Sequence, residues 1–431
     1  MTNEVLQKTA SDEQNVSSSN GLEPLPKLRF LEFKNTYKKT KLNEAVERIQ
    51  RRDPTSEAPV MMLSAASGFI MQSEKYSREN AGQSLKKYIL LRKGELAYNH
   101  GASKYKPFGC CFELKEDEAR IPYVYHCFAV KENNDKSYIA RLLNNQKIDQ
   151  QLKRLISSSV RMDGLLNISY EEYTGIDLYL PSLLEQQKIA DFLFLVDRRI
   201  EKQRQLVESL KKYKRGLLSA IFDHKLRFKD ENGNDYPEWD NFVLDNLGSF
   251  YNGLSGKNKD DFGTGNSEYI TYMNVFKNTI ANETICERVN ILPNEHQNIV
   301  NFGDLLFTQS SETMEEVGFC SVWNSHKKVF LNSFCFGLHF NNSKFAYPQF
   351  MAHYMRSYKI RLLIMRESQG ATRINLSSER LKKIELSLPP YKEQKIIAHF
   401  IERYDNTIQN EEKKLEMFNN LKQGLLQQMF I

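Results

Sequence analysis

The sequence predicts an α+β fold: two globular domains of mixed α/β content, separated by two long antiparallel helices that form a coiled coil. Two observations underlie this prediction. One is an internal repeat at a spacing of about half the chain, and the other is a heptad pattern of apolar residues in each copy of the repeated element. Outside these elements, β-prone runs alternate with helical stretches, which places the domains in the α+β class. The repeat also predicts a pseudo-twofold relation between the two halves.

The repeat is clearest in two segments that begin with a Leu-Pro pair. LPSLLEQQKIADF at 180–192 recurs as LPPYKEQKIIAHF at 388–400, a shift of 208 residues. The match continues without a gap to Phe222 in the first copy and Phe430 in the second. Fainter echoes lie upstream, in KGEL and FGDL at 93–96 and 302–305, and in LRF at 28–30 and 226–228.

Both repeated segments predict a long helix with an apolar seam. Residues spaced by three and four recur from Ile189 to Ile221 and from Ile397 to Met429, as in a heptad pattern. Pro181 and Pro389 end the strand-like stretches before them, because proline cannot donate to a β-ladder. Each helix is predicted to be about 38 residues long, roughly 55 Å at the usual rise per residue. Two apolar seams of this length are best buried against each other.

Four polar residues interrupt the two seams: Gln203 and Lys214 in the first, Glu411 and Lys422 in the second. An antiparallel register that sets Lys214 opposite Glu411 also sets Gln203 opposite Lys422, as a pseudo-twofold axis requires. Polar seam residues can fix a register at some cost in stability, so we interpret these four as register residues. The alternative is that they occupy solvated seam positions without a register role.

The predicted organisation divides the chain into five parts. The start of the chain is rich in Ser, Asn and Gln and is expected to form a loose tail. The polar segment DHKLRFKDENGNDYPEWD is expected to be a linker between the first helix and the second domain. The parts are a tail at 1–23, a domain at 24–178, a helix with its linker at 179–230, a second domain at 231–385 and a helix at 386–431.

Composition fits a globular protein of more than one domain. The chain has 431 residues, of which 40% are hydrophobic and 26% charged, and its net charge of +6 permits a polyanionic partner without requiring one. No window approaches the roughly 20 apolar residues that cross a bilayer, and the polar start lacks a secretory signal, so we expect a cytoplasmic protein without membrane contact. The six cysteines show no metal-ligand spacing, which predicts reduced and mostly buried thiols.

No catalytic or metal-binding motif survives inspection. Leu388-Pro-Pro-Tyr391 has the outline of an amino-methyltransferase motif, but an apolar residue stands where the polar one is required. Gly253-Leu-Ser-Gly-Lys257 lacks the first glycine and the final Ser or Thr of a phosphate loop. The eight histidines form no metal signature, and no nucleophile elbow appears. The sequence therefore predicts no catalytic residue and no metal ligand.

With its repeat laid out, the chain resembles the specificity (S) subunits of type I restriction-modification systems. The resemblance rests on the two Leu-Pro segments with their helices, on GATRINLS at 370–377, and on LRFKDENGNDYPEW at 226–239. In the first half only Arg161 matches Arg373 of the GATR stretch, which leaves the loop geometry there open.

The resemblance implies a non-catalytic subunit with two target recognition domains, each reading one half of a bipartite site in double-stranded DNA. Its helices are implied to set the spacer between the half-sites and to dock two methyltransferase subunits, and through them the restriction subunits that translocate DNA. No cofactor is implied for this chain. S-adenosylmethionine is implied for the methyltransferase partners, and ATP with Mg for the restriction partners, in a system that modifies host DNA and defends against phage.

Base and phosphate contacts need cations, amides and hydroxyls on loops. The loop at 99–106, which follows a predicted strand, and the equivalent loop at 308–313 carry such residues, and Arg161 and Arg373 lie at matching places in the repeat. Each of these polar residues could instead be solvated without a role, and the two arginines could pin their loops. The candidates are Asn99, His100, Ser103, Lys104, Lys106 and Arg161 in the first half, and Lys257, Lys259, Gln309, Ser310, Ser311, Thr313, Thr372 and Arg373 in the second.

Two other classes of function stay open from the residues alone. One is a fused enzyme with an unrecognised active site, which would modify DNA without a partner. The other is a coiled-coil scaffold or adaptor that reads no DNA, which would show no salt-dependent binding to duplex DNA.

Overall fold

The computed structural model describes residues 6–8, 25–75, 82–101, 103, 106–155, 166–342 and 344–431. The chain forms two compact units, one of Met1–Arg204 with Lys413–Ile431 and the other of Gln205–Glu412. Most of the predicted 1–23 tail lies outside the described residues. Within it, β1 (Leu6–Lys8) pairs antiparallel with β2 (Leu28–Phe30).

The central sheet of the first unit has four antiparallel strands in the order β4, β11, β8, β9, with α3 packed against β9 and β11. Asp135 caps α3 by accepting a hydrogen bond from the Tyr138 backbone N–H at 2.8 Å, which satisfies one of the free donors of the first turn. The elements are β4 (Val46–Arg48), β8 (Leu96–Asn99), β9 (Cys110–Glu113), β11 (His126–Val130), α3 (Lys136–Leu142), α4 (Gln146–Leu155) and α5 (Tyr170–Thr174).

Smaller antiparallel pairs complete the first unit. β3 (Lys38–Lys41) pairs with β12 (Asp177–Leu180) before the long helix, and the short helices α1 (Leu42–Ala45) and α2 (Gln72–Lys75) follow β3 and β6. A second apolar cluster lies between the central sheet and two further strand pairs. Its strands are β5 (Met61–Ser64) with β6 (Gly68–Met71) and β7 (Ile89–Arg92) with β10 (Glu118–Ile121), and the 3₁₀ helix η1 (Gly82–Lys87) precedes β7.

The second unit repeats this plan. β13 (Asp240–Val243) pairs with β24 (Glu385–Leu388), and a four-stranded sheet follows in the order β14, β22, β18, β20. The helix α8 (Pro348–Met355) packs on β20 and β18, and its proline stands in the first turn, where a missing N–H costs nothing. The other elements are η2 (Leu244–Leu247), β14 (Gly248–Asn252), β18 (Leu305–Thr308), β20 (Cys320–Val322), β22 (Cys335–Phe340), α9 (Tyr358–Glu367) and α10 (Ser378–Leu381).

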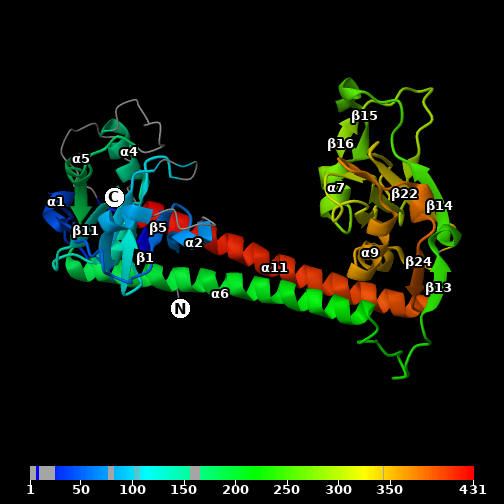
Figure 1. Cartoon of the computed structure of the whole chain (residues 1–431), viewed down its shortest axis with the longest axis horizontal. Helices are drawn as coiled ribbons and strands as arrows, with labels where there is room; N and C mark the ends of the chain where they lie inside the picture. Colours follow the sequence, from blue (N-terminus) through cyan, green and yellow to red (C-terminus); the bar gives the residue numbers. More distant parts are fainter. Residues whose placement is uncertain are drawn as a thin grey trace. The chain divides into compact units, whose positions relative to one another are not determined.

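A second four-stranded sheet, ordered β16, β15, β21, β17, extends the second unit beside α7 (Tyr272–Lys277) (Figure 1). In the first unit the corresponding region holds the two separate strand pairs. The strands are β15 (Phe262–Ile270), β16 (Glu287–Val289), β17 (Ile299–Val300) and β21 (Val329–Leu331), with the 3₁₀ turns η3 (Lys259–Asp261) and η4 (Glu283–Ile285). The two repeats therefore share their central sheets and helices and differ in this outer region.

The predicted long helices are present as α6 (Leu183–Phe222) and α11 (Tyr391–Met429). Their seams are buried as predicted: Ile189, Leu193 and Ile200 are at most 5% exposed in the first unit. In the second unit Ile221, Ile397 and Ile401 are each about 1% exposed. Figure 1 shows α6 and α11 side by side, and ion pairs join them within each unit. The apolar seams thus pair antiparallel.

The two seam lysines form ion pairs that the predicted register does not include. Lys214 pairs with Asp405, and Lys422 pairs with Asp197 at 2.7 Å, whereas Glu411 and Gln203 are the predicted partners. In both helices the observed partner lies six residues N-terminal to the predicted one. These carboxylates are about one third exposed, so the lysines reach charges at the solvated edge of the seam, where desolvation costs less than inside it. The two pairs still exchange under the repeat, as the pseudo-twofold relation requires.

A buried Glu-Gln pair fastens the start of each long helix to its unit. Glu185 is 1% exposed and accepts two hydrogen bonds from Arg29, at 2.7 and 2.8 Å. Glu393, also 1% exposed, accepts the same pair of bonds from Arg227, at 3.1 and 2.7 Å. These arginines are the centres of the two LRF segments, so the faint echo in the sequence marks two equivalent buried ion pairs.

The neighbouring glutamines complete the attachment. The Gln186 side chain accepts from the Asp135 N–H at 2.9 Å, and Gln394 accepts from the Tyr347 N–H at 2.8 Å. Asp135 and Tyr347 are the residues that precede α3 and α8. Each glutamine also donates to the carbonyl of Pro181 or Pro389 five residues before it. The Leu-Pro-x-x-x-Glu-Gln motif is therefore the junction of long helix, strand and domain helix.

Replacing Arg227 with alanine is expected to destabilise the second unit by about 3 kcal/mol, because the Glu393 carboxylate stays buried without its partner. Both tryptophans, Trp239 and Trp323, lie buried in the second unit, so urea unfolding followed by tryptophan fluorescence reports on that unit. The matched control is Lys229→Ala, whose pair with Asp235 is mostly exposed and should cost under about 1 kcal/mol. Equal losses in the two variants would contradict the junction role.

Candidate nucleic-acid interface

The best-formed candidate interface lies in the second unit, where two short strands bring the predicted loops together. β19 (Ser310–Ser311) pairs antiparallel with β23 (Ile374–Asn375), so Ser310 faces Asn375 and Ser311 faces Ile374. Gln309, just before β19, is held by its backbone to Phe334 and Leu376 while its side chain is exposed. The loop after β18 and the GATR stretch, far apart in sequence, therefore form one surface.

A hollow of about 300 Å³ opens on this surface. Its floor includes Ser310 and Ser311, which are less than 10% exposed, and its rim includes Arg373, Phe334 and Met273. The remaining lining residues are Tyr272, Phe276, Glu312 and Glu316. The hollow thus combines a guanidinium, carboxylates and aromatic faces, the groups that contact base edges and unstacked bases.

Arg373 is presented by a tight turn that needs a glycine. Gly370 has φ +134°, and a Cβ there would lie 2.0 Å from the Arg373 carbonyl oxygen. The turn is closed by two hydrogen bonds between Gln369 and Asn375, at 2.9 and 2.7 Å. The exposed Arg373 guanidinium lies 5.7 Å from the centre of the Phe334 ring, a cation–π distance that limits its freedom. Thr372 beside it is also exposed.

Two arginines, the buried Arg361 and the half-buried Arg356, hold the backbone of the loop. Arg361 donates to the carbonyls of Glu315, Val317 and Gly318 at 3.0, 2.5 and 2.9 Å, and it lies over the Phe319 ring. Arg356 lies over the same ring and donates to the Cys320 carbonyl. Burial lowers the pKa of each guanidinium to about 10, so both remain charged at neutral pH. These contacts fix the backbone of 315–320 behind the exposed Thr313 and Gln309.

The predicted residues of the first unit are mostly engaged by their own backbone. Both His100 ring nitrogens lie 2.9 Å from carbonyls, those of Leu166 and Val124, and the residue is 7% exposed. Asn99 accepts from the Gly101 N–H and donates to the Leu63 carbonyl. Lys106 donates to the Asn144 carbonyl at 2.9 Å, and Ser103 accepts from the Lys106 N–H. Lys104 and Arg161 lie outside the described residues.

Of the two lysines assigned to phosphate contacts, Lys257 is already paired. Its side chain is 2% exposed and forms an ion pair with Glu295, so it lies away from any backbone phosphate. Lys259 is exposed in η3. In the region of the hollow, Gln309, Thr313, Thr372 and Arg373 are exposed together, whereas Ser310 and Ser311 are largely covered.

Sequence reasoning missed the apolar part of this surface. Phe334 is 54% exposed and Met273 is 46% exposed, although both are large apolar side chains. Neither residue stands in a motif, and the signal that could have singled out Phe334 is its place in the turn Asn332-Ser-Phe334 between two β-prone runs. Together with Arg373, these two side chains line the hollow.

Three further properties hold for the residues that the structure describes. Within them, no group of three His, Cys, Asp or Glu side chains could hold a metal ion. Among those same residues, no helix has the length and apolar character needed to span a membrane. The six cysteines, all of them described, are unpaired, and five are buried as predicted.

Comparison with known proteins agrees with this architecture. Residues 236–419 match the family model of the type I restriction modification DNA specificity domain. The type I restriction enzyme MjaVIII specificity subunit of Methanocaldococcus jannaschii is 22% identical over 286 residues, which cover 63% of this chain and 65% of that protein. The putative MjaX specificity subunit of the same organism is 23% identical over 312 residues, covering 69% and 67%. The match thus spans about two thirds of each relative.

Two solved structures share the fold. A chain from work on complex assembly and conformational transition of the type I R-M system aligns with a TM-score of 0.57 and 15% identity, covering 93% of this chain and 98% of that one. The S subunit of the type I restriction-modification system from M. genitalium aligns with a TM-score of 0.52 and 14% identity, covering 95% and 99%. The second half of the chain therefore matches the type I specificity domain, and nearly the whole chain shares the fold of these two solved structures.

Proposed function

We propose that this chain is the non-catalytic DNA sequence-specificity subunit of a type I restriction-modification complex, with each unit reading one half of a bipartite site in double-stranded DNA. The observation that carries the proposal is the exposed surface around Arg373, built from two loops on a repeated scaffold. A repeated reader suits a split target, because each copy meets its own half-site.

The chemistry of the surface suits base reading more than phosphate binding. Arginine forms paired hydrogen bonds with guanine and glutamine with adenine. Gln309 directly precedes β19 and Arg373 directly precedes β23, the two strands that pair. Thr313 and Thr372 add hydroxyls, and Lys259 supplies an exposed cation for the phosphate backbone. Glu312 and Glu316 beside them disfavour phosphates, so we place the DNA backbone at the rim of this surface. In the first unit we retain Ser103, Lys104, Lys106 and Arg161 as proposed contacts.

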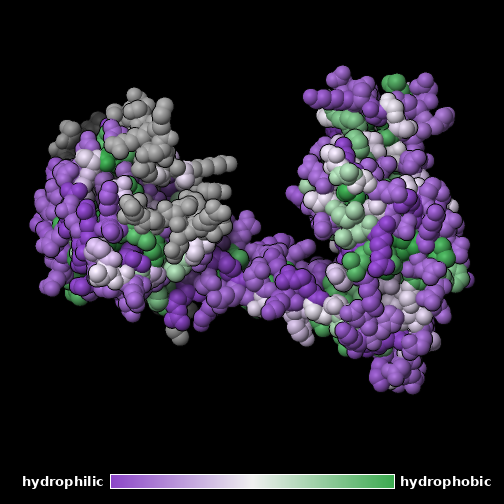
Figure 2. Space-filling view, viewed as in Figure 1, coloured by the Kyte–Doolittle hydropathy of each residue, from purple (hydrophilic) through white to green (hydrophobic). Residues whose placement is uncertain are grey.

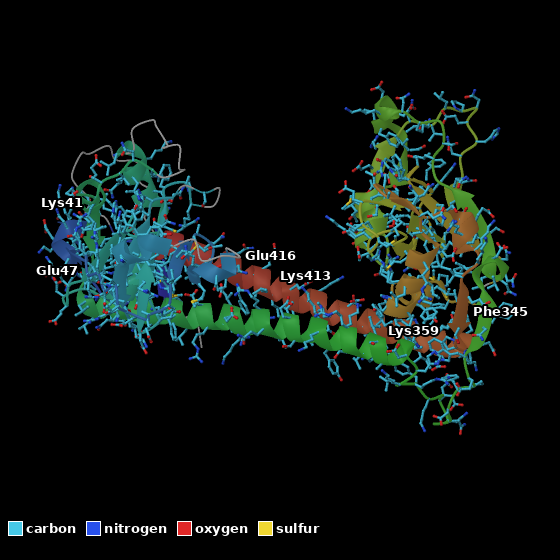
Figure 3. The ribbon with its side chains drawn as sticks, in the orientation of Figure 1. Lys41, Glu47, Phe345, Lys359, Lys413 and Glu416 are labelled. Atoms are coloured by element: carbon cyan, nitrogen blue, oxygen red, sulfur yellow. The ribbon has the colours of Figure 1, made fainter. Side chains whose placement is uncertain are left out.

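We further propose that α6 and α11 set the spacer between half-sites and dock two methyltransferase subunits. Figure 2 shows mostly hydrophilic residues on the visible face of these helices, and Figure 3 labels Lys413 and Glu416 on α11. Large apolar side chains are nevertheless exposed on them, which favours a protein partner. These are Leu184, Phe194, Leu195, Met417 and Leu421 in the first unit, and Leu206 and Tyr213 in the second, all 45–72% exposed.

The chemistry of the complex then belongs to its partners. S-adenosylmethionine is bound by the methyltransferase subunits, and ATP with Mg by the restriction subunits, which act on cytoplasmic DNA in phage defence. A fused enzyme would modify DNA when purified alone, and a pure scaffold would not bind duplex DNA in a salt-dependent way. Either result would replace the present proposal.

Arg373→Ala should weaken binding through the second unit's half-site roughly tenfold or more, because it removes a paired contact worth about 1–3 kcal/mol. Preference at the other half-site should stay unchanged. Binding is measured on duplexes mutated in one half-site at a time, with a methyltransferase partner present, and Lys328→Ala, an exposed lysine elsewhere in the second unit, is the control. Equal loss of discrimination at both half-sites would count against two separate readers.

Arg361→Lys should loosen the reading loop while keeping its charge, since a lysine cannot hold three carbonyls at once. We expect faster amide hydrogen exchange at 315–319 and weaker discrimination at the same half-site that Arg373 reads. Arg366→Lys, on the exposed side of the same helix, is the matched control. Unchanged exchange in the Arg361 variant would show that the loop holds its shape without this residue.

Inserting one helical turn into both α6 and α11, about 5.4 Å of rise, should shift the preferred spacer between half-sites. The spacer is read by selecting bound duplexes from a pool with variable separation. Replacing four residues at the same places without a change in length controls for altered side chains. If the preferred separation stays the same, the helices do not measure it.

A further inference from the structure

A cationic cavity of about 350 Å³ lies in the second unit where α6 meets α8 and α9. Four cations line it, namely Lys214, Arg215, Arg356 and Lys359, whereas Asp223 is its one lining carboxylate. Lys359 lies 3.6 Å from Asp223, and Figure 3 labels it beside the end of α6. Lys214 is paired with Asp405, so an excess of positive charge remains around the cavity.

The N-terminus of α9 lines this cavity, and the side chain of its N-cap residue does not cap the helix. Ser357 precedes the ten-residue helix, and its side chain makes no capping hydrogen bond. The Ser357 hydroxyl oxygen is buried and has no hydrogen-bond partner among the described residues. The first backbone N–H bonded within the helix is that of Arg361, to the Ser357 carbonyl at 2.9 Å. Free N–H groups at the start of a helix, with the positive end of its dipole, favour an anion.

His353 is a further polar residue at the wall of this cavity. It lines the cavity, is 9% exposed, and its ring has no hydrogen bond to any residue that the structure describes. Burial, with Lys214 and Arg356 nearby, lowers the pKa of His353 to about 3. A buried polar ring normally has a partner, and here its neighbours are cations. An anion in the cavity would balance these charges and provide that partner.

The first unit contains the equivalent cavity with its groups already satisfied. The Asn144 side chain donates to the Cys111 carbonyl there, as Arg356 donates to the Cys320 carbonyl, which aligns Asn145 with Ser357 and Arg141 with His353. Asn145 caps α4, accepting from the Lys147 N–H at 3.0 Å, and donates to Leu426. Arg141 pairs with Asp197 at 2.7 Å. The cavity of about 410 Å³ that these residues line therefore has no uncapped helix start at its wall.

We propose that the cavity at the start of α9 binds a phosphate group. The Ser357 hydroxyl and the free N–H groups of the first turn donate to its oxygens, and Lys359, Lys214 and Arg215 supply the balancing charge. The group is either a backbone phosphate of nucleic acid or a free phosphate compound, which share this chemistry. The inference concerns the second unit alone and holds whether or not the Arg373 surface reads DNA.

The first test measures binding of inorganic phosphate to the full chain by calorimetry, at constant ionic strength against chloride. Ser357→Asn reproduces the cap found in the first unit, so it should preserve or raise stability and abolish phosphate binding. Lys359→Gln should weaken binding about tenfold through the loss of a charged hydrogen bond. Lys328→Gln removes the same charge outside the cavity and should leave binding unchanged.

Absence of phosphate binding to the unmodified chain would overturn the proposal. It would also fail if phosphate bound with the same affinity to the Ser357 and Lys359 variants. Because Lys359 is largely exposed, its variant should fold even if the Ser357 variant does not.

A competition experiment then identifies the source of the phosphate. If duplex DNA displaces inorganic phosphate and Lys359→Gln lowers the affinity for DNA more than Lys328→Gln does, the site binds the DNA backbone. If DNA affinity is the same in the two variants while phosphate binding is lost only in the Lys359 variant, the site serves a free phosphate compound. Both results support a phosphate site.

Discussion

The structure depends on the buried carboxylate at the start of each long helix. Glu185 and Glu393 would each be strongly disfavoured inside a core if left alone, and each is instead bound by two nitrogens of one arginine. That arginine comes from a segment outside the helix, so the pair closes a chain segment onto the helix start. A guanidinium suits the task because its planar fork meets both carboxylate oxygens. The adjacent glutamine extends the junction to the backbone before the next helix.

This junction explains how equivalent long helices can be attached to two units whose outer regions differ. Glu-Gln, the Leu-Pro lead-in and the arginine form one polar cluster, and the apolar seam of the helix follows directly. The outer regions beyond the central sheets, two strand pairs in one unit and a four-stranded sheet in the other, can then differ without disturbing the attachment. The ion pairs Lys214–Asp405 and Lys422–Asp197 are equivalent under the repeat, so the same lysine–aspartate contact occurs in both units.

The repeat made much of this fold predictable. The helix bounds and the antiparallel pairing of the helices follow from the 208-residue shift and the heptad seams. The register partners did not follow, because side-chain length and solvent exposure at the seam edge decide which carboxylate a lysine reaches. In the sequence, the junction arginines stand out only as the centres of the two LRF segments. Their role depends on ion pairs with glutamates more than 150 residues further along the chain.

The interface was harder to predict for a physical reason. A polar loop residue reads the same in sequence whether it bonds its own backbone or faces solvent, and His100 and Lys257 turned out to be engaged internally. Arg373 is distinguished by features of the fold, namely the positive φ of Gly370 and the nearby Phe334 ring. An exposed aromatic in a turn gives no periodic signal, so the apolar rim of the hollow could be found only in three dimensions.

The two units share a fold plan but differ in the side chain that precedes α4 in one and α9 in the other. The cap before α4 is an asparagine bonded to its own helix, and the cap before α9 is a serine left without a partner. The residue at this position thus caps the helix start in the first unit and leaves helix donors free in the second. Because each cap precedes a ten-residue helix, the contrast between the two helix starts lies in the side chain at the cap.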